Sequence, residues 1–303
     1  MTSTKTTTTK TNHYFGALVA LAMIAAILAL SALSASASGK QGADLKQSVS
    51  GSNKKDAAVA TTSSTATTPK ASFASGSGAN FFGVKVSDHG NLMSFESPQG
   101  QEATFSGQEG YAVCSNFGNT VHGHDTGSVE SGFGAPTFSQ PNPGAFPLTV
   151  TRKTTDGKFQ LKQVWNKPDA KEKDVTVAMT LTNISGATID HVNLSRSGDF
   201  DVGNSDSDQG ARTLDSAWQW NDLSSDADRP PVGAMLSALT LGTDHGAHIE
   251  SRSDWAGGTR EECLTVGQTT PTSVQDLTMR VVYDLLDFNA GQSKTVKFEY
   301  ERM

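Results

Sequence analysis

Two pairs of histidines have the spacing that a zinc site would need. They are His122 and His124 in VHGHD, and His245 and His248 in TDHGAH. His122 and His124 are two apart, so on an extended chain their rings point to the same side, and structural zinc takes four ligands in a tetrahedron, two of which a second pair nearby could supply. The four rings would therefore hold zinc if the two segments met in the fold. The alternative is that these glycine-containing segments are loops whose histidines are exposed or locally hydrogen-bonded.

The segment SGDFDVGNSDSDQG, residues 197–210, is dense in the oxygen ligands that Ca²⁺ prefers. It does not fit an EF-hand loop, because the best register starts at Asn204 and places Gln209 where the template needs glycine. A looser calcium loop on a β-sheet protein is the remaining metal hypothesis, and a solvated acidic turn is the alternative. The candidate calcium ligands are Asp199, Asp201, Asn204, Asp206, Asp208 and Asp215.

Trp218 and Trp220 in SAWQW share one face of a strand, because they are two residues apart. Exposed aromatic rings can stack on sugar rings, which would suit carbohydrate recognition, and burial in the core is the alternative. The motifs G-x-S-x-G and H-E-x-x-H and the phosphate-binding P-loop do not occur in the chain. We therefore assign no catalytic residue, and the sequence leans away from an enzyme.

The two cysteines of the chain predict one disulfide. Cys114 and Cys263 do not form a CxxC motif. Residues 1–37 have the layout of an export signal, which is described below. Exported proteins form and keep disulfides, so a Cys114–Cys263 bond is expected. Two separate buried thiols are the alternative.

Composition and charge narrow the class of protein. The chain has 303 residues, of which 18 % are charged and 36 % hydrophobic, and glycine is abundant. This profile fits an all-β protein with disordered additions. Residues 1–80 carry a net charge of +5 and the remainder carries −12. Nucleic acid is excluded as a partner of the body, because phosphate contact requires a basic surface.

Residues 1–37 have the layout of an export signal. Lys5 and Lys10 precede an apolar run from Ala17 to Leu33, and Ala35-Ser36-Ala37 fits the small-residue cleavage pattern. The run is almost long enough to span a bilayer, so a retained anchor is the alternative to cleavage. Either way the body lies outside the cytoplasmic membrane, secreted, periplasmic or anchored, and meets the membrane only through this segment.

Residues 38–80 are rich in Ser, Thr, Ala, Gly and Lys, and we expect a disordered tether there. Residues 81–303 then alternate between short strand-like runs and turns, which predicts an antiparallel β-sandwich. The clearest strand is DVTVAMTLTN, 174–183, where valine, methionine and leucine occupy every second position. We favour one domain, and a boundary near 140–147, QPNPGAFP, would divide it into two.

The segment VTVAMTLTNISGATIDHVNLS resembles the strand–turn–strand unit of bacterial extracellular immunoglobulin-like domains. FNAGQSKTVKFEY is similar to their closing strand, which follows a glycine turn. The resemblance covers only residues 174–202 and 286–300. It implies a sandwich with an adhesive or structural role, and it carries over no catalytic residue.

These observations lead to one main prediction and two alternatives. The main prediction is an exported, non-catalytic β-sandwich protein of the cell envelope or secreted space, with a structural or adhesive role. The first alternative is a carbohydrate-binding module, in contact with a glycan or cell-wall polymer. The second is a carbohydrate-active or metal-dependent enzyme. No cofactor is required by the sequence, and calcium is the one ion that it suggests.

Overall fold

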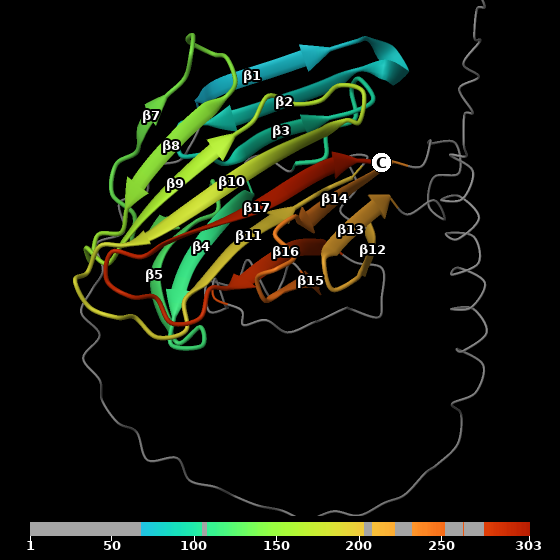
Figure 1. Cartoon of the computed structure of the whole chain (residues 1–303). Helices are drawn as coiled ribbons and strands as arrows, with labels where there is room; N and C mark the ends of the chain where they lie inside the picture. Colours follow the sequence, from blue (N-terminus) through green and yellow to red (C-terminus); the bar gives the residue numbers. More distant parts are fainter. Residues whose placement is uncertain (1–67, 105–107, 203–207, 222–231, 252–262, 264–275) are drawn as a thin grey trace, which may run out of the picture. The chain divides into compact units, whose positions relative to one another are not determined.

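Strand β10 (Asp174–Asn183) shows how the sequence pattern sets the main sheet. Val175, Val177, Met179 and Leu181 are fully buried, and the residues between them are partly exposed. β10 pairs antiparallel with β9 on one side and with β17 on the other (Figure 1). The alternation predicted from the sequence therefore gives a strand with one face on the core and one face outward.

The structure is a computed structural model that describes residues 68–104, 108–202, 208–221, 232–251, 263 and 276–303. Its largest sheet has eight strands in the order β12-β13-β14-β17-β10-β9-β8-β7, all paired antiparallel. Besides β10, the strands are β7 (Thr137–Ser139), β8 (Leu148–Lys153), β9 (Phe159–Trp165), β12 (Asp208–Arg212), β13 (Ser216–Asn221), β14 (Gly233–Ala238) and β17 (Ser293–Arg302).

A second sheet of six strands has the order β15-β16-β11-β4-β5-β6. Its central strands β4 and β11 are buried along their whole length, so both faces of this sheet are covered. The strands are β4 (Glu109–Ser115), β5 (Thr120–Asp125), β6 (Glu130–Ser131), β11 (Asn193–Asp199), β15 (His245–Ser251) and β16 (Leu277–Asp284).

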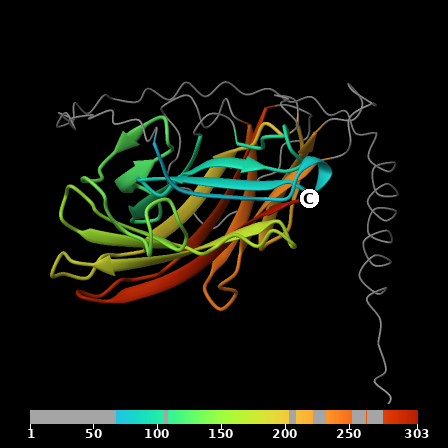
Figure 2. The ribbon, with the colours of Figure 1, turned by 90° about the horizontal axis from the view of Figure 1, so that it is seen from above.

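A third sheet contains β1 (Pro69–Ser75), β2 (Phe82–Ser87) and β3 (Leu92–Glu96), with a short 3-10 turn η1 (Gly78–Asn80) between β1 and β2. Its aromatic side chains make a series of edge contacts, from Phe73 to Phe82, from Phe82 to Phe95 and from Phe95 to Tyr300 of β17. In the view from above, β1 and β2 lie along one side of the body and β10 and β17 along the other (Figure 2).

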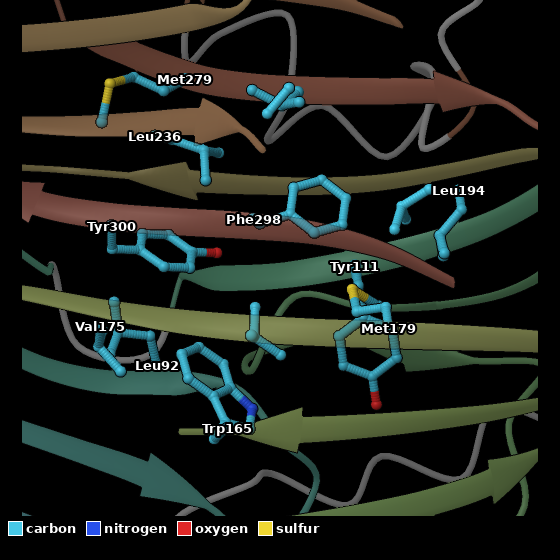
Figure 3. Packing of buried hydrophobic residues seen from close by; sticks show 14 of the residues in the cluster. Leu92, Tyr111, Trp165, Val175, Met179, Leu194, Leu236, Met279, Phe298 and Tyr300 are labelled. Carbon is cyan, nitrogen blue, oxygen red and sulfur yellow. The ribbon is translucent and has the colours of Figure 1, made fainter. Parts of the chain in front are cut away.

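One hydrophobic core joins all three sheets. It contains Leu92 of the three-stranded sheet, Leu194 and Met279 of the six-stranded sheet, and Trp165 and Phe298 of the eight-stranded sheet (Figure 3). The prediction of an all-β antiparallel protein is confirmed, and the layers are consistent with a β-sandwich. The immunoglobulin-like resemblance is confirmed only at that level, since those sandwiches have seven or nine strands.

The predicted return of the chain after β10 differs from the structure. β11 does not pair with β10, and instead pairs with β4 and β16 in the six-stranded sheet. β16 and β17 are likewise in different sheets. The second segment that resembles an immunoglobulin-like unit contains a single strand, β17, and the first therefore crosses from one sheet to another. The reason is that β11 and β16 are buried on both faces, which suits the covered sheet.

The folded body begins earlier than predicted. β1 starts at Pro69, inside the segment expected to be a disordered tether, because Ala71 is fully buried and Phe73 packs on the core. The suggested boundary at 140–147 falls between β7 and β8, which pair in one sheet, and the described residues belong to one compact unit. The export segment 1–37 and the tether as far as residue 67 lie outside the described residues. No helix among the described residues is long and apolar enough to cross a membrane.

Candidate functional site

β13 presents Trp218 and Trp220 on the outer face of the eight-stranded sheet. Ala217 and Gln219, which alternate with them, are fully buried, and Gln219 Nε2 donates a 2.9 Å hydrogen bond to the carbonyl of Leu277. This inward anchor fixes which side of the strand faces the core. Both tryptophans are partly exposed, and neither belongs to the buried core.

The strand registers place further side chains beside the tryptophans. Trp218 pairs with Ala211 of β12 and with Met235 of β14. Met235 pairs with Glu301 of β17, which in turn pairs with Asp174 of β10. Directly opposed residues of paired strands share a face. Five strands therefore align these five side chains in one row across the outer face.

Trp220 and Glu299 extend this row on its two sides. Trp220 Nε1 donates a 3.1 Å hydrogen bond to Oε1 of Gln209, which fixes the orientation of the indole. Glu299 lies two residues before Glu301 on β17 and pairs with Thr176 of β10. We name this surface the Trp–acid face, and it comprises Asp174, Trp218, Trp220, Met235, Glu299 and Glu301.

Three carboxyl groups of the Trp–acid face have raised pKa values. Partial burial is the main cause for each of them. Repulsion adds to it: Asp174 and Glu301 act on Glu299, Asp174 and Glu172 act on Glu301, and Asp169 and Glu172 act on Asp174. No local sequence pattern marks these acids as a group, because β10, β14 and β17 become neighbours only in the folded sheet.

Buried Arg196 and Glu109 contact the inward face of β17 through Tyr300. Tyr300, between the two glutamates, points inward, and its hydroxyl contacts both Arg196 and Glu109. Arg196 Nε lies 2.7 Å from the Tyr300 hydroxyl, and its guanidinium lies 4.7 Å from the centre of the Trp165 ring. Because Tyr300 is fixed by these contacts, the outward direction of its neighbours on β17 is fixed as well.

A second buried cluster joins the turn after β2 to the six-stranded sheet. His89 Nδ1 lies 3.0 Å from Asp125 and 3.3 Å from Glu130, and Arg152 forms ion pairs with both carboxylates. Hydrogen bonds to Asp125 and then Glu130 raise the pKa of His89 to about 9. Two acids and two bases balance one another here, so the cluster serves to tie elements together. Tyr111 joins it by donating to the carbonyl of His89 at 2.8 Å.

The structure does not bring the four predicted zinc ligands together. His122 contacts Asp156 at 2.6 Å, and His245 contacts Asp215 at 2.8 Å. An irregularity in the pairing of β4 with β5 separates His122 from His124 in register, so the two rings do not share surroundings.

The other two histidines lie on opposite halves of the six-stranded sheet. His124 pairs with Ala112 of β4, whereas His248 pairs with Arg280 of β16. Burial, together with the nearby arginines, lowers the pKa of His248 to about 4, so its ring is neutral near pH 7. Their strands β5 and β15 are separated by β4, β11 and β16.

Two of the six predicted calcium ligands lie together. Asp199 and Asp201 each place a carboxylate oxygen within 4.8 Å of the other and of Asp276, a residue that was not among the predicted ligands. Asp215 is elsewhere, beside His245. Asn204 and Asp206 lie outside the described residues, and for Asp208 only the backbone, in β12, is described. Calcium at this group remains a hypothesis.

Cys114 and Cys263 are bonded to each other, with their Cα atoms 5.7 Å apart. Both are buried and form a small cluster with Ala112. Cys114 and Ala112 alternate with Tyr111 and Val113, which belong to the main core. The disulfide therefore lies on the face of the six-stranded sheet that is turned away from the main core.

Comparison with known proteins gives a likeness of fold. No family model matches the chain, and no curated protein matches it. A bacterial glucoamylase solved in complex with acarbose is similar over 82 % of this chain and 34 % of its own, with a TM-score of 0.50 and 8 % identity. A polysaccharide lyase is similar over 70 % of this chain and 30 % of its own, with a TM-score of 0.35 and 10 % identity. The chain thus spans about a third of the length of these proteins.

The main functional prediction is corrected by this comparison. A non-catalytic protein with a structural or adhesive role was expected, but the similar structure with a TM-score of 0.50 is that of a carbohydrate-active enzyme, the glucoamylase. At such low identity the likeness shows the fold alone. The choice between the remaining alternatives must therefore come from the chain's own residues.

Proposed function

We propose that this chain is a carbohydrate-recognising β-sandwich and that the Trp–acid face is its glycan-binding surface. The observation that carries the proposal is the pair of partly exposed indoles, Trp218 and Trp220, on one outward face of β13. Large flat aromatic rings offer an apolar surface to the CH faces of sugars, and the indole N–H adds a polar end.

The setting of the two rings supports binding by a preformed surface. The indoles are roughly 7 Å apart along the strand, since residues alternate with a rise of about 3.4 Å each. Gln209 fixes the ring of Trp220, and the buried Gln219 fixes the strand beneath them. Rings that are already ordered lose little entropy on binding, which favours affinity.

Polar groups beside the rings add hydrogen-bonding capacity for sugar hydroxyls. Glu299 and Glu301 offer acceptors on β17, and Asp174 and Thr176 follow on β10 with partial exposure. A glycan surface needs such groups next to an aromatic platform, since apolar contact alone gives little specificity. The predicted export signal supports the same function, because an exported protein meets polysaccharides outside the cell.

The test is titration calorimetry of the chain with a panel of soluble oligosaccharides, including acarbose, neutral glucans and amino-sugar oligomers. We expect binding to at least one of them, and a loss of about fivefold or more in affinity for Trp218→Ala or Trp220→Ala, because each stacked ring contributes about 1 kcal/mol or more.

Phe138→Ala is the matched control. Phe138 is 47 % exposed on β7, at the opposite edge of the same sheet. Its removal should leave affinity unchanged. Equal affinity of the wild type and the two tryptophan variants for every bound sugar would refute the proposed surface. Release of reducing sugar, measured on the same panel, separates a binding module from an enzyme.

A further inference from the structure

We propose that the Trp–acid face selects glycans that carry protonated amino groups, such as oligomers of glucosamine, over neutral or uronic-acid glycans of the same length. The inference rests on the proposed function, because it names the class of sugar that the same surface takes. It is carried by the side-by-side placement of an aromatic platform and three carboxylates.

The negative charge is concentrated where the platform ends. Asp174 and Glu301 are directly opposed on neighbouring strands, and Glu299 follows one row further along β17. Two more acids, Asp169 and Glu172, lie in the turn before β10 and are close enough to act on this group. Five acids thus surround one end of the face.

The turn before β10 also holds Lys167, Lys171 and Lys173, so the five acids and these three lysines leave this region with a formal net charge of −2. Lys171 forms an exposed ion pair with Glu172 in the turn. Lys297, the next outward residue of β17, is one row beyond Glu299 and pairs with Ala178. The groups that act on the pKa values of the three carboxyls, apart from burial, are all acidic. A positively charged ligand is therefore the complement of this end of the face.

Burial and repulsion raise the free energy of the ionised carboxylates, and a nearby cation lowers it. An ammonium group brought beside Glu301 and Asp174 would favour their ionised forms and would gain from their attraction. A uronic acid in the same place would add a further negative charge. The face therefore discriminates by charge as well as by stacking.

The distances suit a short oligosaccharide. Trp218 and Glu301 are separated by one strand, β14, so their positions are roughly 10 Å apart. Met235 lies between them and provides an apolar floor. A sugar ring on Trp218 would place the next ring over Met235, with its amino group toward the carboxylates.

The decisive experiment compares two oligomers of equal length, one of glucosamine and one of N-acetylglucosamine, by calorimetry on the full chain at about pH 6, where the free amine is charged and ordinary carboxyls are ionised. We expect the glucosamine oligomer to bind about fivefold more tightly or better, the scale of an exposed ion pair. The preference should shrink as salt is added, because salt screens exposed charges.

Isosteric variants assign the preference to the carboxylates. Glu301→Gln combined with Asp174→Asn should remove the preference and leave affinity for the N-acetylated oligomer unchanged. Asp244→Asn, an exposed aspartate in the loop between β14 and β15, is the matched control and should change neither affinity.

The outcomes separate this inference from the proposed function. Equal binding of both oligomers, lost in Trp218→Ala, would overturn the amine preference and keep the carbohydrate surface. Binding of both oligomers that Trp218→Ala leaves intact would overturn both. A simple diamine that binds as tightly as the glucosamine oligomer would show attraction to charge alone and would overturn the assignment to a glycan.

Discussion

Arg196 and Glu109 form a fully buried ion pair across β11 and β4, with Nη2 of Arg196 2.6 Å from Oε1 of Glu109. Arg196 also donates to Oε1 of Gln163 at 2.7 Å and to the carbonyl of Gly90 at 3.1 Å. The pair thus links the six-stranded sheet to β9 and to the turn after β2. Burial raises the pKa of Glu109, and the guanidinium opposes that rise.

Removal of one member of this pair should be severely destabilising. Arg196→Met leaves the Glu109 carboxylate buried without its partner, a change that costs about 3–5 kcal/mol of unfolding free energy. The double variant Arg196→Met with Glu109→Gln should recover much of that loss, because no buried charge is left. Urea unfolding of the three proteins measures both values. A loss below about 1 kcal/mol in Arg196→Met would contradict the role given to the pair.

His89 makes stability depend on alkaline pH. Its pKa in the folded protein is raised to about 9, above the ordinary value of 6.5, by hydrogen bonds to Asp125 and Glu130. A raised folded pKa gives stability that is complete below pH 6.5 and is lost as pH rises through 9. The loss amounts to about 3 kcal/mol.

The measurement is the pH dependence of unfolding free energy between about pH 6 and 10 for the wild type and His89→Gln. Arg152, the other cation facing the two carboxylates, keeps its charge throughout, so the difference between the two curves isolates His89. The wild-type curve should fall more steeply, and parallel curves would contradict the prediction.

Local patterns predicted individual strands well. The bounds of β10 agree with the sequence prediction because period-two alternation reports directly which side chains face the core. The shared face of Trp218 and Trp220 followed from the same rule.

Relations between distant strands could not be predicted from one sequence. Asp174 and Glu301 meet only because β10 and β17 pair, and 126 intervening residues belong to other strands and turns. His122 and His124 do not share a face, because the pairing of β4 with β5 is irregular between them. No residue type in the sequence predicts that irregularity. Asp276 joined Asp199 through the folding of a distant segment. Whether residues from distant strands form a site could therefore be decided only once the sheet topology was known.

The two classes of tryptophan should respond differently to truncation. Trp165 is fully buried and stacks on Tyr300 with ring centres 5.9 Å apart, so Trp165→Ala should cost about 3–5 kcal/mol. Trp218 is partly exposed on the outer face, so Trp218→Ala should cost less than about 1 kcal/mol. Thermal and urea unfolding check both. A large loss in Trp218→Ala would mean that this ring serves stability, and its effect on glycan binding would then need a stable variant such as Trp218→Phe.

The disulfide should couple energetically to Gly118. This glycine has a φ of +81°, and a Cβ added to it would lie 2.3 Å from the backbone oxygen of Cys263. Gly118→Ala should therefore destabilise the wild type by more than about 1 kcal/mol. Loss of the Cys114–Cys263 bond, whose residues are 149 apart in sequence, should itself cost up to about 5 kcal/mol in the chain-entropy model.

A double-mutant cycle tests the coupling. In a Cys114→Ser, Cys263→Ser background the backbone at position 263 is no longer tied to β4 and can move away from the new methyl group. Gly118→Ala should then cost less than in the wild type, with an interaction free energy of about 0.5 kcal/mol or more. If both backgrounds lose the same amount, the cost of the alanine comes from the positive φ alone, and Cys263 does not confine that turn.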